Sequence, residues 1–267
     1  MAKKALGQHF LSDPRILSRI ADQLPAAPGD PVLEIGPGKG ALTRVLLARG
    51  FRVVAIERDR DLVPTLRTTF PTLHLIEGDA LTVDWVEAMG RPERWFLAGN
   101  IPYNITTPLI DQALEARPAP TAIVFLIQKE VALRLAAAPG SSDYGALSVG
   151  AQAAARIERC FSVGAGSFQP PPKVDSAVVR LTPKPEAERV PDPASFRRFV
   201  VGLFTARRKQ LVRALRTAFD FSADAATALV ATADLTPDQR AETLTVGEFR
   251  RLHQLIVDGG MSDRLTL

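Results

Sequence analysis

The first two-thirds of the chain alternates short apolar runs with segments of helical spacing. Short runs rich in Val, Ile, Leu and Phe are typical of strands that are buried on both faces of a sheet. Alternation of this kind predicts an α/β fold in which a parallel sheet carries helices on both faces. The expected strands are 31–35, 52–57, 73–77, 94–99 and 122–128, and the expected helices are 41–49, 59–70, 106–116 and 129–138.

Two later apolar runs, 155–163 and 174–181, follow one another without a helical segment between them. Parallel neighbours need a long crossover, which is absent here, so we expect an antiparallel pair at the edge of the sheet. This arrangement departs from a plain dinucleotide-binding fold. It matches the Rossmann-like, seven-stranded sheet of class I methyltransferases.

Residues 184–193 are rich in proline and charge, which is typical of a linker. The segment after it shows only helical patterns, with helix starts expected at Thr236-Pro237 and at Thr245. A chain of 267 residues is long enough for one large domain and a small appendage. We therefore expect an α/β domain over 1–183 and a small all-α domain over 184–267.

Composition points to a cytoplasmic protein. Hydrophobic residues make up 46% of the chain, but no apolar stretch is long enough to span a membrane. The basic start, with Lys3 and Lys4, is not followed by an apolar signal core. Cys160 is the single cysteine, so it forms no internal disulfide and fits a reducing compartment. Because Cys160 lies in a strand-like run, we interpret it as a packing residue rather than a nucleophile.

Positive charge is concentrated in one segment. The net charge of +4 favours a nucleic-acid partner only weakly, but seven basic residues and no acidic one lie between Arg197 and Arg216. Solvated helices usually mix both signs, so we interpret this segment as a phosphate-binding surface rather than a solvated cationic face. Its richness in arginine suits phosphate recognition or reflects a GC-rich genome, and composition does not separate the two. The candidate contacts are Arg197, Arg198, Arg207, Arg208, Lys209 and Arg213.

A glycine-rich turn, Gly36-Pro37-Gly38-Lys39-Gly40, joins the first expected strand to a helix. Glycines let a backbone turn sharply and approach a ligand closely, so Gly36 and Gly38 are candidate cofactor contacts. About twenty residues later the next strand ends at Glu57, where a carboxylate can accept from both ribose hydroxyls of an adenosine cofactor. The turn is not a P-loop, because Lys39 is followed by Gly40 rather than Ser or Thr. NAD is the main rival, but its third glycine comes one residue later than Gly40 does.

Two more acids lie near strand ends. Glu34 precedes the glycine turn and is suited to accept from loop amides or to help hold a cationic ligand. The alternative for Glu34 is a solvated strand end. Asp79, after the third strand, can accept the amino group of an adenine, although Gly78-Asp79-Ala80 also fits an ordinary turn.

The segment Gly99-Asn100-Ile101-Pro102-Tyr103-Asn104 follows the fourth strand, at the edge where open α/β sheets bind ligands. An exocyclic amine is a poor nucleophile because its lone pair is delocalised into the ring. Two acceptors can rotate and pyramidalise it: the side-chain oxygen of Asn100 and the carbonyl of Ile101, which Pro102 holds extended. Tyr103 can stack on the base. Positioning of the amine then accounts for most of the rate enhancement. Neither a catalytic His or Cys nor a metal is expected.

These motifs resemble the KsgA (RsmA) family of small-subunit (16S) rRNA adenine N6,N6-dimethyltransferases. The resemblance covers nearly the whole chain and is most specific at Gln-His-Phe-Leu and at Phe-x-Pro-Pro-Pro-Lys-Val-Asp-Ser. Many members have leucine in place of Ile101, which matters little because its carbonyl is used. The matching segments are 3–11, the loop glycines, 100–103, 168–177 and a basic helix over 204–213.

The resemblance implies S-adenosyl-L-methionine as cofactor, bound by His9, Leu11, Gly36, Glu57, Asp79 and Asn100. It also implies that Phe168 faces Tyr103 across an adenine flipped out of its helix. Stacking between two rings recovers about 1–3 kcal/mol per base, which offsets part of the unstacking cost. A stiff proline run follows Phe168, so we expect its ring to be presented rather than buried.

We expect a monomeric enzyme that dimethylates two adjacent adenines near the 3′ end of small-subunit rRNA and contributes to small-subunit biogenesis. Three alternatives remain open. One is a large-subunit rRNA adenine methyltransferase of the antibiotic-resistance type, which shares the Asn-x-Pro-Tyr chemistry. Another is a DNA adenine methyltransferase, although no separate sequence-reading domain is visible. The last is a non-catalytic transcription or assembly factor, against which the intact Glu57, Asp79, Asn100 and Tyr103 set speaks.

Overall fold

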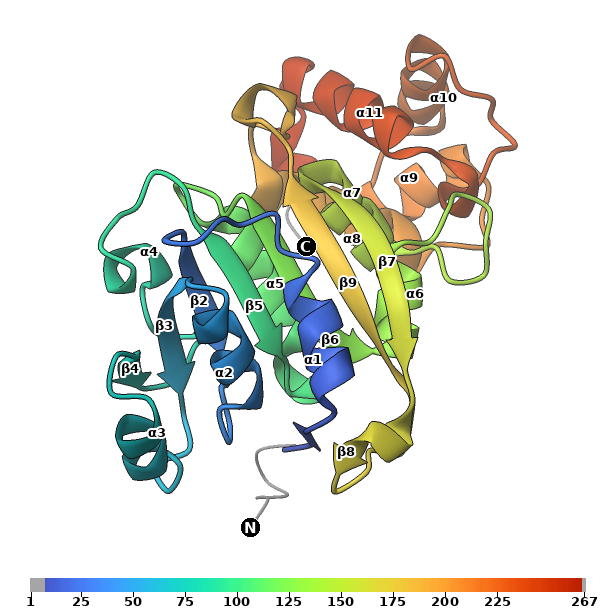
Figure 1. Cartoon of the computed structure of the whole chain (residues 1–267). Helices are drawn as coiled ribbons and strands as arrows, with labels where there is room; N and C mark the ends of the chain where they lie inside the picture. Colours follow the sequence, from blue (N-terminus) through green and yellow to red (C-terminus); the bar gives the residue numbers. More distant parts are fainter. Residues whose placement is uncertain (1–7, 266–267) are drawn as a thin grey trace. The chain divides into compact units, whose positions relative to one another are not determined.

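A seven-stranded sheet forms the centre of the first of two structural units (Figure 1). The computed structural model describes residues 8–265, so the predicted family segment 3–7, with Lys3 and Lys4, lies outside the described residues. The strand order is β4-β3-β2-β5-β6-β9-β7. The strands are β2 (Pro31–Ile35), β3 (Arg52–Glu57), β4 (His74–Glu77), β5 (Phe96–Asn100), β6 (Ala122–Gln128), β7 (Ala155–Val163) and β9 (Ser176–Pro183).

The sheet is parallel except at one edge. All pairs from β4 to β6 are parallel, whereas β9 runs antiparallel to both β6 and β7. The predicted α/β class and the antiparallel edge pair are therefore confirmed. The chain proceeds from β2 outward to β4 and then returns to place β5 on the other side of β2. Such a reversal opens a crevice at the carboxyl ends of the central strands.

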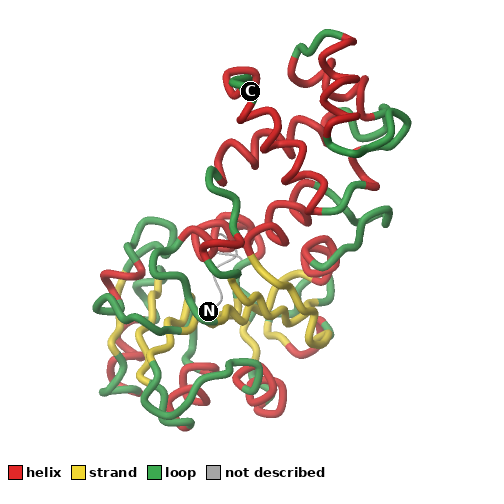
Figure 2. Tube along the Cα trace, turned by 90° about the horizontal axis from the view of Figure 1, so that it is seen from above, coloured by secondary structure: helices red, strands yellow, loops and turns green. Residues whose placement is uncertain are grey.

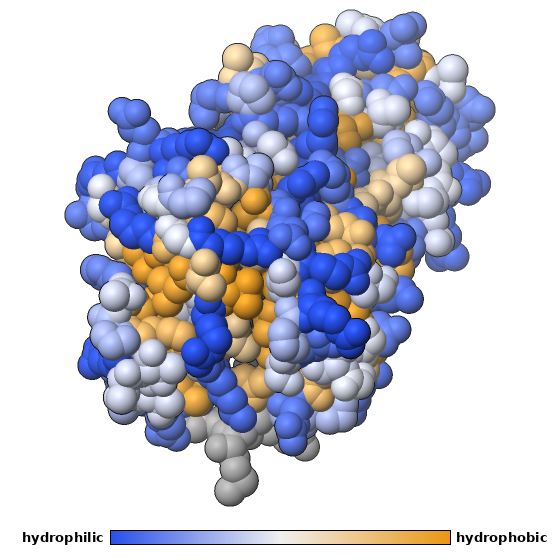
Figure 3. Space-filling model, viewed as in Figure 1, coloured by the Kyte–Doolittle hydropathy of each residue, from blue (hydrophilic) through white to orange (hydrophobic). Residues whose placement is uncertain are grey.

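Helices cover both faces of this sheet, which Figure 2 shows as a yellow layer between red helices. They are α1 (Pro14–Ala21), α2 (Ala41–Ala48), α3 (Val63–Thr69), α4 (Trp85–Ala88), α5 (Thr106–Glu115) and α6 (Lys129–Leu135). In the view of Figure 1, α1 and α2 lie in front of the sheet and α5 behind it. Buried Ile20 of α1 and Leu46 of α2 pack with Val32 and Phe96 of the strands. Figure 3 shows hydrophobic residues reaching the surface around these front helices.

A second, two-stranded sheet was not predicted. β1 (Phe10–Leu11) pairs antiparallel with β8 (Phe168–Gln169), with Leu11 opposite Phe168. Strands this short carry no hydrophobic period, so the sequence pattern does not reveal them. The pairing brings the N-terminal segment onto the loop that precedes β9.

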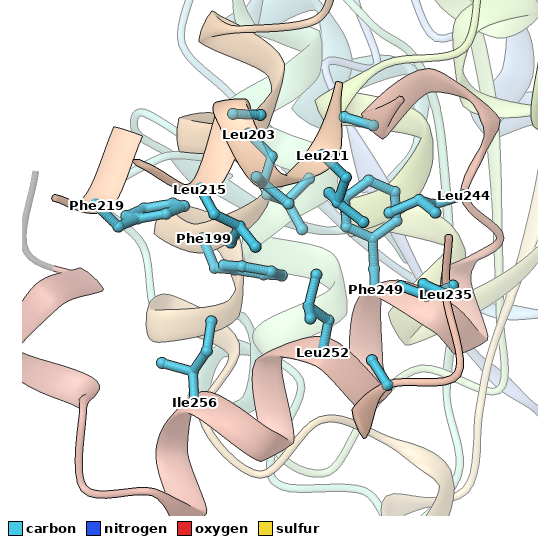
Figure 4. Packing of buried hydrophobic residues seen from close by; sticks show 14 of the residues in the cluster. Phe199, Leu203, Leu211, Leu215, Phe219, Leu235, Leu244, Phe249, Leu252 and Ile256 are labelled. Carbon is cyan, nitrogen blue, oxygen red and sulfur yellow. The ribbon is translucent and has the colours of Figure 1, made fainter. Parts of the chain in front are cut away.

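The second unit consists of Leu133–Ala154 and Lys184–Leu267. Its helices are α7 (Ala146–Ala154), α8 (Pro193–Thr205), α9 (Leu211–Phe219), α10 (Ala223–Thr232) and α11 (Val246–Asp258), with short 3₁₀ turns at Glu186–Glu188, Ala241–Thr243 and Ser262–Leu265. Figure 4 shows Phe199 at the centre of their shared core, with the rings of Phe199 and Phe219 stacked at 5.6 Å. A side chain at Gly202 would place its Cβ 2.4 Å from Phe219, so this contact requires glycine.

The division of the chain differs from the predicted 1–183 and 184–267 at one segment. The passage into the second unit after Pro183 lies where the linker was predicted, but Leu133–Ala154 packs with the second unit. Tyr144 explains this, because it is fully buried and its hydroxyl donates to the Leu244 carbonyl at 2.8 Å. The sequence pattern shows where a helix forms, but it does not show which hydrophobic core the helix packs against.

Three local predictions in the second unit had different outcomes. The capping box of α11, formed by Thr245 and Glu248, confirms the predicted helix start. The helix start at Thr236-Pro237 was wrong, since these residues form a turn closed by Gln239. The basic helix over 204–213 was also wrong: α8 ends at Thr205, a turn follows, and α9 begins at Leu211. The turn lets the apolar faces of both helices reach one core.

In the part of the chain from residue 8 to residue 265, no helix combines the length and hydrophobicity that a membrane crossing requires.

Candidate active site

A cavity of about 220 Å³ lies at the carboxyl ends of the parallel strands in the first unit. It lies at the reversal between β2 and β5, where the topology predicts a ligand site. The structure brings together there every predicted cofactor residue and all but one of the predicted catalytic residues. Those lining it are His9, Leu11, Gly36, Gly38, Glu57, Asp79, Asn100, Ile101, Pro102 and Tyr103.

The glycine turn forms one wall of the cavity. Gly36, Gly38 and Gly40 all have positive φ angles, of 66°, 60° and 78°, which side-chain-bearing residues rarely adopt. A Cβ on Gly40 would also lie 2.2 Å from the ring of Phe70. No side chain projects from the turn at Gly36 and Gly38, so a ligand can approach the backbone closely.

Glu57 lies at the end of β3 with both carboxylate oxygens turned to the backbone. Its Oε2 accepts from the Gly38 amide at 2.9 Å, and its Oε1 accepts from the Asp59 amide at 2.7 Å. Burial raises the pKa of Glu57, while these backbone hydrogen bonds oppose the shift. Each oxygen keeps a second lone pair, so the carboxylate can still accept from a diol.

Glu34 is buried, with 1% of its surface exposed, so the solvated strand end that we considered is excluded. Its Oε2 accepts from the Thr43 hydroxyl at 2.6 Å, which ties the end of β2 to α2. Burial raises the pKa of Glu34 to about 8. At neutral pH the side chain is therefore mostly protonated.

Asp79 follows β4 and is held from two directions. Its Oδ1 accepts from the Leu81 amide at 3.0 Å, and its Oδ2 lies 3.2 Å from a guanidinium nitrogen of Arg58. The turn at Gly78-Asp79-Ala80 is therefore both a local turn and part of the cavity wall.

Asn100 ends β5 with its amide oriented by the N-terminal segment. Its Nδ2 donates to the His9 carbonyl at 2.8 Å. The neighbouring Ile101 is buried, and its amide donates to the Leu126 carbonyl at 3.0 Å. With the Asn100 nitrogen engaged, its Oδ1 is the atom available as an acceptor.

The ring of Tyr103 is fixed by two contacts. Its hydroxyl lies 2.7 Å from the Ser176 hydroxyl. Its ring stacks on that of His9, with centroids 5.7 Å apart and planes at 28°. His9 in turn donates from Nδ1 to the Pro170 carbonyl at 2.8 Å. The aromatic neighbour of Tyr103 is therefore His9.

Phe168 differs from its predicted placement. Only 5% of it is exposed, and it does not line the cavity. It packs instead in the hydrophobic cluster with Leu11, Val163 and Val178. The antiparallel β1–β8 pair directs its side chain inward, so the stiff proline run that follows does not present the ring.

Sequence reasoning missed the cavity residues Phe10 and Gln169 and the serine that holds Tyr103. Phe10 lies against the glycine turn, because a Cβ on Gly38 would be 3.0 Å from its ring. All three residues belong to motifs that the family resemblance singled out. The places of Phe10 and Gln169 depend on the pairing of β1 with β8, which the hydrophobic pattern does not reveal.

The predicted phosphate contacts lie in the second unit. Arg197 and Arg198 are exposed on α8, and Arg213 is exposed on α9. Arg208 and Lys209 are exposed in the turn between these helices. Arg198 donates to the Leu265 carbonyl at 3.1 Å, and Lys209 donates to the Thr217 hydroxyl at 3.1 Å.

Arg207 lies in the same turn but is engaged internally. Its Nε lies 2.6 Å from Glu242, and its Nη2 donates to the Ser142 carbonyl at 3.1 Å. The basic segment contains no acidic residue, but the fold places Glu242 beside Arg207.

Cys160 is half-buried beside the sheet cluster, and burial raises the pKa of its thiol. A raised pKa keeps the thiol protonated, as a packing role requires.

Comparison with known proteins identifies the family of this chain. The model of a family described as ribosomal RNA adenine dimethylase matches residues 1–258. The chain belongs to the ribosomal RNA adenine dimethylases. The match extends from the cavity through most of the helical unit, so both units belong to the family pattern.

Two relatives of this dimethylase are each named ribosomal RNA small subunit methyltransferase A. The protein of Geobacter metallireducens is 44% identical over 264 residues, which cover 96% of each chain. That of Pseudomonas aeruginosa is 42% identical over 255 residues, covering 94% of this chain and 93% of its own.

Two solved structures are similar to this dimethylase over nearly its full length. A dimethyladenosine transferase from Plasmodium falciparum has a TM-score of 0.84 at 26% identity, covering 94% of this chain and 98% of its own. The 23S rRNA methyltransferase ErmE has a TM-score of 0.70 at 29% identity, covering 92% and 98%. These similarities agree with the seven-stranded methyltransferase fold predicted from the sequence.

Proposed function

We propose that the protein transfers methyl groups from S-adenosyl-L-methionine to N6 of two adjacent adenines near the 3′ end of 16S rRNA, in the small ribosomal subunit. The observation that carries this is the Asn100 amide, held by the His9 carbonyl at 2.8 Å beside the ring of Tyr103. The names of the relatives from Geobacter and Pseudomonas support the small subunit as the substrate.

The cavity residues suit an adenosine cofactor. Glu57 offers acceptors for a ribose, and Asp79 offers one for the adenine amino group. The turn at Gly36 has no side chain, so it lets the cofactor lie close to the backbone. His9, Leu11 and Gly38 complete this wall. When bound, the cofactor would supply a methyl group on a sulfonium, and the neutral thioether left behind needs no acid to depart.

Asn100 and Ile101 activate the nucleophile by orienting it. The Asn100 Oδ1 and the Ile101 carbonyl accept from the two N–H groups of the adenine amine, which turns its lone pair out of conjugation. Tyr103 stacks on the base. The residues from Gly99 to Pro108 include no His, Cys or Lys, and the cationic product amine loses its proton readily without a base.

One cavity serves both transfers in this proposal. After the first methylation one N–H remains, so one of the two acceptors gives up its hydrogen bond. The monomethylated base is then held mainly by stacking. We therefore expect monomethyl adenine to be a competent intermediate in the same site.

The direct test is to incubate the protein with labelled cofactor and with unmethylated small or large ribosomal subunits. We expect label on two adjacent adenines near the 3′ end of 16S rRNA, identified by mapping and by mass spectrometry of the nucleosides. Label on an adenine of the large subunit would instead support the function in the name of ErmE. Absence of label in both subunits would reject the proposal.

Replacing Glu57 with alanine should weaken cofactor binding. The carboxylate is expected to accept charge-assisted hydrogen bonds from the ribose, and losing them costs about 1.5–3 kcal/mol. Calorimetric titration with S-adenosyl-L-methionine measures this loss. Because Glu57 also accepts from the Gly38 and Asp59 amides, thermal unfolding must be recorded in parallel. Unchanged affinity in a folded variant would remove Glu57 from the cofactor site, and tight NAD binding would overturn the cofactor assignment.

We propose that the exposed cations of the second unit bind rRNA phosphates. Replacing Arg208, Lys209 and Arg213 with glutamine should weaken binding and reduce its salt dependence. Each lost contact should lower the slope of log K against log salt by about 0.7–0.9. Filter binding across a salt series measures the slope.

Arg207→Gln is the matched comparison, because the Arg207 guanidinium is already paired with Glu242. We expect this variant to keep the wild-type slope and to lose stability instead. A slope that falls by about 0.7–0.9 in Arg207→Gln would mean that Arg207 leaves Glu242 to bind RNA. An unchanged slope in the triple variant would place the RNA surface elsewhere.

A further inference from the structure

A buried serine, Ser176, anchors the ring of Tyr103, which follows the proposed amine acceptors Asn100 and Ile101. The Ser176 and Tyr103 hydroxyl oxygens are 2.7 Å apart. Ser176 has 0% of its surface exposed, whereas Tyr103 is half-buried at the cavity. The serine belongs to the Phe168–Ser176 motif, whose part in the site had been assigned to Phe168.

The backbone of Ser176 is held rigidly. It is the first residue of β9, and it lies opposite Gln128 of β6 on one side and Val163 of β7 on the other. A hydroxyl carried on the end of a strand between two hydrogen-bonded neighbours has a fixed position. It is therefore a firm attachment point for a side chain that reaches it.

The ring of Tyr103 needs such an attachment. Tyr103 follows Pro102 in a short 3₁₀ turn, Tyr103–Ile105, and not in the sheet itself. Its ring also stacks on that of His9, which lies on the N-terminal segment with its centroid 5.7 Å away. The phenol oxygen of a tyrosine lies on the Cβ–Cγ axis, so a tyrosine held at its Cα and at its hydroxyl has a fixed χ1 and a fixed direction of the long axis of the ring.

We propose that Ser176 is a positioning residue that fixes the position of the Tyr103 ring and thereby sustains the second methyl transfer. The inference rests on the proposed function. In the first transfer two acceptors hold the amine, but in the second only one hydrogen bond remains, so the base depends more on the ring. A phenylalanine at position 103 would stack equally well but would have no bond to Ser176.

A double-mutant cycle tests the link in the full-length protein. The variants are Ser176→Ala, Tyr103→Phe and their combination, with Ser162→Ala on the exposed side of β7 as the matched serine control. We expect each site variant to lower kcat of the second transfer about 3- to 10-fold, the size of one hydrogen bond, with KM for the cofactor unchanged. The combination should be no slower than either single variant, since both remove the same bond.

A spectroscopic measurement separates positioning from a general structural role. The chain has 2 tyrosines, so protein labelled with 3-fluorotyrosine gives two ¹⁹F signals, from Tyr103 and Tyr144. Ser176→Ala should shift the Tyr103 signal and leave that of Tyr144, which lies in the second unit, unchanged. Ser162→Ala should shift neither. If Ser176→Ala does not fold, Tyr103→Phe removes the same hydrogen bond and should alone reproduce the kinetic effect.

The outcomes distinguish this inference from the proposed function. Additive losses in the combined variant, or an unmoved Tyr103 signal in Ser176→Ala, would overturn the role of Ser176 while wild-type dimethylation continued. A wild-type protein that methylates neither subunit would overturn the proposed function, and the ¹⁹F signals would still decide whether Ser176 holds the ring.

Discussion

Replacing Asn100 with alanine is expected to lower the rate of methyl transfer by about 10²- to 10³-fold, the range for losing one preorganised hydrogen bond to a transition state. The variant removes the acceptor proposed to rotate the adenine amine out of conjugation. Only the side chain is lost, so the carbonyl of Ile101 and the ring of Tyr103 remain. Single-turnover kinetics with saturating rRNA and cofactor measure the chemical step directly.

Asn100→Asp separates the two ends of the Asn100 amide. The carboxyl group introduced keeps an acceptor for the amine but loses the donor that meets the His9 carbonyl at 2.8 Å in the wild type. We expect an intermediate rate that increases as the pH falls, because the protonated carboxyl can again donate to that carbonyl. A near-normal rate in a folded Asn100→Ala protein would mean that the Asn-Ile-Pro-Tyr segment does not orient the nucleophile.

The strands of the first unit could be predicted because burial and hydrophobicity begin and end together. The predicted runs 31–35, 52–57, 122–128 and 155–163 coincide with β2, β3, β6 and β7. β2, β3 and β6 have neighbours on both sides, so the apolar run marks the strand, whereas the edge strand β7 is buried only at its two ends. By contrast, β5 ends one residue later than predicted, at Asn100, because that polar residue pairs with Leu126 of β6.

The predicted site residues gathered at one edge for a topological reason. Glu57 and Asn100 end parallel strands and Asp79 closely follows one, and the carboxyl ends of parallel strands meet at one edge. Contacts between distant segments could not be predicted in this way. The pairing of Arg207 with Glu242 joins residues 35 apart in sequence, which a local count of charges does not detect.

Phe168 shows the same limit within the site. From sequence, an aromatic residue before three prolines fits a ring presented on a stiff loop. Its environment depends on β1, which lies more than 150 residues earlier in the chain, since Leu11 pairs with Phe168. The pairing closes the cluster of Leu11, Val163 and Val178 around the ring.

Replacing Phe168 with alanine is therefore expected to destabilise the protein by about 3–5 kcal/mol, the usual cost of emptying a buried phenylalanine site. For a chain of this size each kcal/mol lowers the Tm by about 2–4 °C, so thermal unfolding followed by circular dichroism detects the change. Bound cofactor should raise the Tm of both proteins, and by less in the variant, because β1 contributes Leu11 both to this cluster and to the cavity wall.

Phe168→Leu distinguishes the two roles of this residue, because leucine fills most of the volume but cannot stack on a base. If the ring serves the core, as its 5% exposure indicates, Phe168→Leu should stay close to the wild type in both stability and dimethylation. If the ring leaves the cluster to face Tyr103 across a flipped adenine, Phe168→Leu should keep its stability and lose the second methyl transfer. The second result would mean that the β1–β8 pair opens when rRNA binds.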